Sequence, residues 1–370
     1  MDTKEQQGKF ASSQNMFADT NMAPAPVEPA LLEVPAAVEE AAPAVGEQKP
    51  RKKPSTPLQD SLRRLRRDYR AMASLGVILL FFIIPLVGPA IYQHIGVSYN
   101  STLNGTISPS VYHNPFHQEL DRQDEGPSAQ YWLGTDDIGR DLLARLMQGM
   151  LISISVALLV EVVDIGLGIL VGTLAGFYGG WIDQFLARFT DIMLAFPGLL
   201  FAILLTGIFG TAADTALSRL PVIGANGNAR LIIVSLALAF TAWPLMARYV
   251  RGQTLQLKEQ QFVEAARTSG TSDTRIIMRH IVPNLFNIVV VASTLNIAAT
   301  VIGEAGLSFL GLGVQPPGSS IGLMIYDGLS LTDTHPWEVL LPSITLTLVV
   351  LAFSFLGDGL RDAFDPRSKD

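Results

Sequence analysis

Residues 261–284, QFVEAARTSGTSDTRIIMRHIVPN, form a polar and basic segment between two long apolar stretches. The segment is too polar to cross a bilayer and too long to be a tight turn. Val263, Ala265 and Ala266 belong to a short helical pattern that ends at Gly270, a residue type that tolerates the left-handed backbone found at helix C-termini. A threonine and a serine follow and can cap a second helix. The sequence therefore predicts a helix, a sharp corner and a second helix between two membrane spans.

The flanking apolar stretches belong to a larger set. A bilayer core of about 30 Å needs roughly 20 apolar residues in a helix. Six stretches reach this length, at 71–92, 148–177, 189–209, 230–250, 284–303 and 339–360. The chain is 49% hydrophobic and 16% charged, whereas soluble domains are about 25% charged. We expect an all-α polytopic membrane protein with six transmembrane helices and a transmembrane core over 148–360.

The basic residues predict the orientation of these spans, because loops rich in Lys and Arg stay in the cytoplasm. Lys and Arg number 17 on one side, at 51–70, 178–188, 251–283 and after 360, and 4 on the other, at 93–147, 210–229 and 304–338. Both termini and the 251–283 loop are therefore expected in the cytoplasm, with 361–370 as a short C-terminal segment. The 93–147 loop is expected outside the cell membrane.

The N-terminal region divides into a tail and a basic helix. Residues 1–57 are rich in Ala and Pro and are expected to be disordered. Residues 58–70, LQDSLRRLRRDYR, place leucines at helical spacing among five arginines, which predicts an amphipathic helix lying on the lipid of the inner leaflet. Nucleic-acid binding is not expected of this patch, because a membrane span follows it directly.

Charged residues cluster at the end of the long external loop, at Asp136, Asp137, Arg140, Asp141 and Arg145. They stand just before the second span, where ion pairs would anchor the start of the helix. Contact with a protein that delivers substrate is the alternative function for this cluster.

The 261–284 segment also resembles the EAA loop of ABC import permeases, through Glu264, Ala265, Ala266, Gly270 and the HIVPN run that contains Pro283. The resemblance implies that this loop docks on a cytoplasmic ATPase. The two alanines permit close approach, the glycine permits the corner, and the glutamate can pin the loop to a nearby arginine. The alternative is a purely structural re-entry segment.

Three further segments narrow the resemblance to the C-type subunits of dipeptide, oligopeptide and nickel permeases. They are LGTDDIGRDLLARLMQG from Leu133, GFYGGWIDQFLARFTDIMLAFP from Gly176 and LSFLGLGVQPP from Leu307, the last together with LGDGLRDAFDPR near the C-terminus. The resemblance implies a type I importer permease fold and peptide transport, with nickel or another small solute as the alternative substrate.

The same resemblance implies the partners. They are a second, B-type permease subunit, two cytoplasmic ATPase subunits and an external substrate-binding protein. The chain contains no GxxxxGK sequence followed by Ser or Thr, so we expect no ATPase site in it. ATP and Mg²⁺ would be bound by the partner ATPases, and no cofactor is expected in this chain.

Two functions outside this family are the alternatives. A secondary transporter should show inverted internal repeats with broken helices, and none is evident in the sequence. An intramembrane hydrolase needs a nucleophile and a base within the spans, but no histidine falls in a predicted span. The absence of cysteine removes thiolate chemistry. His113 and His117 enclose Asn114 and Pro115, which argue against a helix, so no metal site is predicted.

Glu161 and Asp164 stand in the middle of the second predicted span. A carboxylate there costs at least about 2.5 kcal/mol on insertion scales, so the pair should face the bundle interior, a partner or water. Three roles remain open for the pair. It can line the translocation path and attract a cationic substrate, contact the partner permease, or stay neutral and hydrogen-bonded in a structural role.

Gly168, Gly172 and Gly176 recur every fourth residue in the same span. This spacing places three small residues on one helix face and permits close approach of another backbone. The sequence leaves two possible partners for this face, a helix of the same bundle or a second subunit.

Overall fold

The computed structural model describes residues 57–217 and 229–364. The tail predicted to be disordered therefore lies outside the described residues, except for Pro57. Six helices in these ranges are long and apolar enough to cross a membrane, as predicted. They are α2 (Tyr69–Tyr92), α4 (Leu142–Tyr178), α6 (Gly198–Leu217), α7 (Ala229–Leu257), α10 (Phe286–Phe309) and α12 (Trp337–Phe364).

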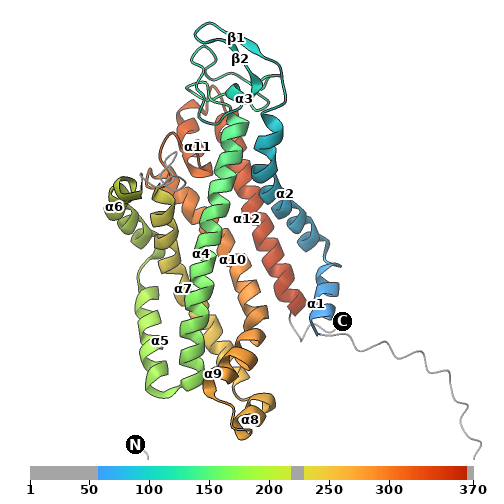
Figure 1. Cartoon of the computed structure of the whole chain (residues 1–370), viewed down its shortest axis with the longest axis vertical. Coiled ribbons are helices and arrows are strands. Elements are labelled where there is room, and N and C mark those ends of the chain that lie inside the picture. The colour runs from blue at the N-terminus through green and yellow to red at the C-terminus, as the bar shows by residue number, and fades with distance from the viewer. Residues whose placement is uncertain (1–56, 218–228, 365–370) are drawn as a thin grey trace, which may run out of the picture. The chain divides into compact units, whose positions relative to one another are not determined.

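Helix α4 runs through the middle of this bundle, with α7 packed along it (Figure 1). It has 37 residues and so spans about 55 Å, longer than the roughly 30 Å core of a bilayer. Its start at Leu142 lies six residues before the predicted start, because the Asp141 carboxylate caps the helix by accepting the N–H groups of Leu143 and Ala144.

The glycine row of α4 faces α7 of the same chain. A Cβ built on Gly168 would stand 2.3 Å from Met246, and one on Gly172 would stand 2.5 Å from the carbonyl oxygen of Ala247. These separations are far below van der Waals contact, so only glycine permits this approach. Of the two partners that the sequence left open, the structure places the row against a helix of its own bundle.

A second layer packs on the other side of α4. Helices α2, α10, α11 (Ile321–Gly328) and α12 enclose an apolar core with α4. Its buried members include Ile78, Phe81, Met150, Val301 and Phe353. The short 3₁₀ turn η4 (Leu329–Leu331) follows α11.

The third span was predicted at the wrong place. The 189–209 stretch contains the end of α5 (Gly180–Ala195) and the beginning of α6, with a break between them. Phe196 has an extended backbone, with φ −82° and ψ 132°, because the proline that follows disfavours the helical conformation at its preceding residue. The apolar composition continues through this break, so hydropathy alone does not locate it.

The basic helix before the first span is shorter than predicted. Helix α1 (Pro57–Leu65) ends five residues before residue 70, and the Asp68 carboxylate begins α2 by accepting the N–H groups of Arg70 and Ala71. Leu65 packs against the bundle core, whereas Tyr69 already belongs to α2 and is 74% exposed.

The two ends of the bundle differ (Figure 1). At one end, residues 93–141 form the cap, with an antiparallel pair β1 (Tyr99–Ser101) and β2 (Gly105–Ile107) and the turn α3 (Pro109–Tyr112). At the other end, residues 258–285 form the corner loop, which carries α8 (Gln261–Thr268), α9 (Asp273–Ile276), η2 (Ile277–Ile281) and η3 (Val282–Leu285).

The glycine contact can be tested with Gly172→Ala, measured by thermal unfolding of the purified chain in detergent. The added methyl meets backbone, so we expect destabilisation of about 1 to 3 kcal/mol and a lower melting temperature. Gly166→Ala is the matched control, because a Cβ at Gly166 of the same helix meets nothing within 4 Å. Equal melting temperatures for the two variants would show that α4 and α7 do not approach this closely.

Candidate functional site

The corner loop turns at Gly270. Helix α8 ends at Thr268 with Ser269 as its C-cap, and Gly270 then adopts φ +74°, the left-handed conformation that the sequence predicted. The Gly270 N–H donates to the Arg267 carbonyl oxygen at 2.9 Å, and the Thr271 N–H donates to that of Ala266 at 3.1 Å. These two bonds form a Schellman motif, which satisfies the last carbonyls of α8 and fixes the direction of the exit.

Two side chains anchor α8 to the bundle. Val263 is fully buried in an apolar cluster with Phe177, Val250 and Ile281. The Arg267 guanidinium lies 5.1 Å from the centre of the Phe177 ring, in cation–π contact. The helix is therefore held at its first turn by apolar burial and at its last turn by an arginine.

The opposite face of α8 is exposed. Glu264, Ala265 and Gly270 are exposed, and Ala266 is half-buried. The expected pairing of Glu264 with an arginine is not observed, because no described residue forms an ion pair with its carboxylate. Arg267 instead fastens the helix, through an aromatic ring. The Glu264 carboxylate and the small Ala265 side chain therefore remain available to another protein.

The segment that leads from the corner into the membrane changes helix type three times. Helix α9 continues into the π-helical η2 and the 3₁₀ turn η3, and α10 begins at Phe286. Pro283, which is exposed, lies in η3 and has no N–H to donate, so the regular ladder is interrupted there. The Asn284 side chain donates to the His280 carbonyl oxygen at 2.7 Å and secures the turn.

Glu161 and Asp164 lie inside the chain, 5% and 1% exposed. They face α10, where the Asn296 amide donates to Glu161 Oε1 at 2.7 Å and to Asp164 Oδ2 at 3.3 Å. The glycine row faces α7, so α4 uses adjacent faces for two different contacts. No basic side chain among the described residues forms an ion pair with either carboxyl.

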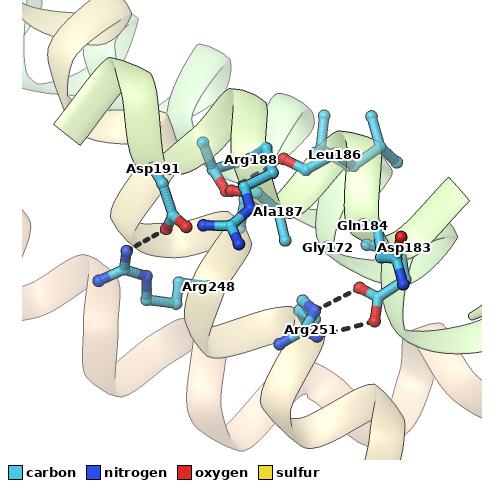
Figure 2. Close-up of a pocket in the computed structure, with 13 residues that line it drawn as sticks. Gly172, Asp183, Gln184, Leu186, Ala187, Arg188, Asp191, Arg248 and Arg251 are labelled. Carbon is cyan, nitrogen blue, oxygen red and sulfur yellow. Dashed lines mark hydrogen bonds and ion pairs between the residues drawn. The ribbon is translucent and has the colours of Figure 1, made fainter. Parts of the chain in front are cut away.

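A polar cavity of about 340 Å³ lies between α4, α5 and α7 (Figure 2). The Arg251 guanidinium donates to both oxygens of Asp183, at 2.5 and 2.8 Å, and Arg248 donates to Asp191 at 2.6 Å. Arg188 lines the same cavity. Sequence reasoning missed this site, because each ion pair joins residues 57 or more positions apart. Opposite charges on facing helices, Asp on α5 and Arg on α7, were the signal that could have revealed this site.

The charged cluster beside α4 forms the ion pairs that the sequence predicted. The Arg145 guanidinium, 1% exposed, lies 2.5 Å from Asp136 and 3.0 Å from Asp327, and Arg140 pairs with Asp136 at 2.7 Å. Partial desolvation of its carboxyl and the neighbouring carboxylates of Asp136 and Asp327 raise the pKa of Asp137. The buried pairs anchor α4 between the cap and α11.

His113 takes part in the same anchor. Its Nδ1 atom lies 2.6 Å from the Asp141 carboxylate and its Nε2 atom lies 3.1 Å from the Ile95 carbonyl oxygen. The ring also stacks on Tyr92, with 3.7 Å between ring centres. His117 instead lies beside Glu119, at 3.5 Å. The two histidines therefore have separate partners within the cap.

Two family models match the chain. Residues 168–370 match the binding-protein-dependent transport system inner membrane component, and residues 56–104 match the N-terminal TM domain of oligopeptide transport permease C. The first match covers the glycine row, the polar cavity and the corner loop.

Curated relatives extend the match over most of the chain. The dipeptide transport system permease protein DppC of Bacillus subtilis is 36% identical, over 84% of this chain and 85% of its own. The oligopeptide transport system permease protein OppC of Mycobacterium tuberculosis is 34% identical, over 83% and 94%. The glutathione transport system permease protein GsiD of Pectobacterium atrosepticum is 36% identical, over 85% and 92%. The chain therefore belongs to the family of binding-protein-dependent transport system inner membrane components, the multi-pass permease subunits of ABC importers.

Proposed function

We propose that this chain is one permease subunit of a heteromeric peptide importer, and that α8 couples it to a cytoplasmic ATPase. The observation that carries the proposal is the exposed corner at Glu264, Ala265 and Gly270, held rigidly by Val263 and Arg267. A rigid helix that presents small side chains and one carboxylate suits insertion into a groove of a partner protein.

The other partners follow from the family. A second, B-type permease would complete the pore, two ATPase subunits would bind ATP and Mg²⁺, and an external protein would deliver the substrate. The relatives named for dipeptides, oligopeptides and glutathione support a peptide as substrate. The excess of basic residues near the α8 end supports a cytoplasmic position for that end and for both termini.

The burial of Glu161 and Asp164 bears on their role. A group that lines the path or contacts the partner permease needs an exposed face, but both carboxyls lie inside this chain against Asn296. We therefore assign the pair to the hydrogen-bonded structural role, in which Asn296 joins α10 to α4.

Gly270→Val tests the coupling role in vesicles that contain the complete importer and its binding protein. Wild type should take up dipeptides or oligopeptides with ATP. Valine at φ +74° costs on the order of 1 to 3 kcal/mol and should distort the corner. We expect membrane insertion to persist while uptake and substrate-stimulated ATP hydrolysis fall.

Gly270→Asn is the control, because asparagine tolerates the left-handed conformation. It should retain more activity than the valine variant. Normal uptake by Gly270→Val would exclude the coupling role of the corner, and a wild-type importer that moves nickel but no peptide would contradict the substrate.

The orientation can be tested with single cysteines, because the chain contains none. Leu103 in the cap is 62% exposed and Gln260 at the start of α8 is exposed, so both positions can accept a thiol reagent. In sealed right-side-out vesicles, a membrane-impermeant maleimide should label Leu103→Cys and spare Gln260→Cys until the vesicles are opened. The reverse pattern would overturn the assigned orientation.

The structural role of the buried carboxyls predicts different results for two sets of changes. The double variant Glu161→Gln with Asp164→Asn keeps shape and hydrogen bonding, so assembly and uptake of cationic and neutral peptides should be unchanged. Asn296→Leu removes the donor that both carboxyls share and should lower stability by about 1 to 3 kcal/mol.

Asn287→Leu is the matched control for this second change, because Asn287 is exposed on the same helix. A selective loss of cationic peptide uptake in the double variant would favour path lining. Failed assembly of the double variant with the second permease would favour a partner contact.

A further inference from the structure

Asp124, His335 and Glu338 meet where the cap rests on the start of α12. Asp124 belongs to the cap, His335 stands just before α12, and Glu338 lies in the first turn of α12. Each residue offers one potential ligand atom, and these atoms all lie within 4.8 Å of one another. A residue 211 positions away in sequence thus joins a local His–x–x–Glu pair.

Glu338 is buried, Asp124 and His335 are half-buried, and each of the three leaves a polar atom without a partner. Asp124 Oδ1, His335 Nδ1 and Glu338 Oε1 are each inaccessible to water, and no described residue hydrogen-bonds to them. Glu338 is 3% exposed. Unpaired polar atoms in a folded interior cost free energy, so three such atoms on side chains that lie this close together indicate a missing ligand.

The surrounding charge favours a cation as that ligand. The nearby arginines, Arg140 and Arg145, already pair with Asp136 and Asp327. No basic side chain among the described residues pairs with Asp124 or Glu338. The carboxylates of Asp136 and Asp137 also act on Glu338 and add negative potential there.

We propose that Asp124, His335 and Glu338 bind one divalent transition-metal ion of the Zn²⁺ class. One imidazole nitrogen with two carboxylate oxygens suits such ions, whereas Mg²⁺ and Ca²⁺ prefer oxygen ligands alone. Ligands at about 2.1 Å from one ion lie roughly 3 to 4 Å apart, so small side-chain rotations complete the site. Water fills the remaining position.

The metal would join the cap to the start of α12. Asp124 is held in the cap by its N–H, which donates to the Asp136 carbonyl oxygen at 3.0 Å, and the Glu338 N–H donates to the His335 carbonyl oxygen at 3.2 Å. An ion between them ties the cap to α12 and stabilises the end of the bundle that α8 does not occupy.

The experiment uses the full-length chain without an affinity tag, in lipid nanodiscs, after stripping with EDTA. Zn²⁺ binding is measured by equilibrium dialysis with elemental analysis. Co²⁺ binding is followed by fluorescence quenching, because the Trp337 ring lies 5.1 Å from the His335 ring. We expect one Zn²⁺ per chain, a higher melting temperature with Zn²⁺, and Co²⁺ quenching that Zn²⁺ reverses.

His335→Asn and Asp124→Asn should each weaken Zn²⁺ binding at least tenfold and abolish the thermal shift. Both residues are only half-buried, so two independent variants guard against the misfolding of one, and each is first checked for monodisperse elution. His94→Asn is the matched control, because His94 is exposed and lies outside the cluster. It should bind Zn²⁺ as wild type does.

Wild type that binds less than one Zn²⁺ per chain, or variants that bind as wild type does, would overturn the proposal. Loss of binding in His94→Asn alone would also overturn it, because the ion would then sit elsewhere. These outcomes are independent of transport activity, so they are separate from the test of the importer function.

Discussion

The approach of α4 to α7 is the contact on which the rest of the structure depends. Three glycines leave the α4 backbone bare on this face, so α7 approaches it closely and brings Met246 and Val250 beside α4. The same two residues continue into the apolar cluster that buries Val263 of α8. The position of the exposed corner therefore follows from a helix contact that begins inside the membrane. In a lipid environment, where apolar side chains gain little by leaving lipid, such close packing is a main source of stability.

Polar side chains, some buried and some exposed, join the other helices. Asn296 links α10 to the carboxyls of α4, and Arg251 and Arg248 link α7 to α5. Each link uses a charged or amide group whose partner stands on a different helix, so it specifies which faces meet as well as adding stability. The break at residues 196–197 matters here. It ends α5 at Ala195, one turn after Asp191, so that α6 can take a different direction from α5.

Local patterns in the sequence predicted local structure well. Residue type predicts the left-handed corner at Gly270, and composition predicts the six membrane helices. Both features depend only on residues that are close together in the sequence. The glycine spacing predicted a close contact but could not identify its partner, because Gly172 and the Ala247 that it meets on α7 lie 75 residues apart in the chain. The break before α6 was missed because apolar residues lie on both sides of Pro197. The cavity ion pairs and the cluster at Asp124 were missed because tertiary folding alone brings their members together.

The two ends of the bundle are held by different interactions. At the α8 end, one valine and one cation–π contact hold a short helix whose other face stays exposed, so a partner can bind without displacing internal contacts. At the cap end, Arg145 and Asp136 are almost fully buried and their charges are paired within the chain. Separating such a pair leaves a buried charge uncompensated, which costs about 3 to 5 kcal/mol. The cap is thus fixed on α4 by paired buried charges, while the corner leaves the Glu264 carboxylate and the Ala265 side chain exposed.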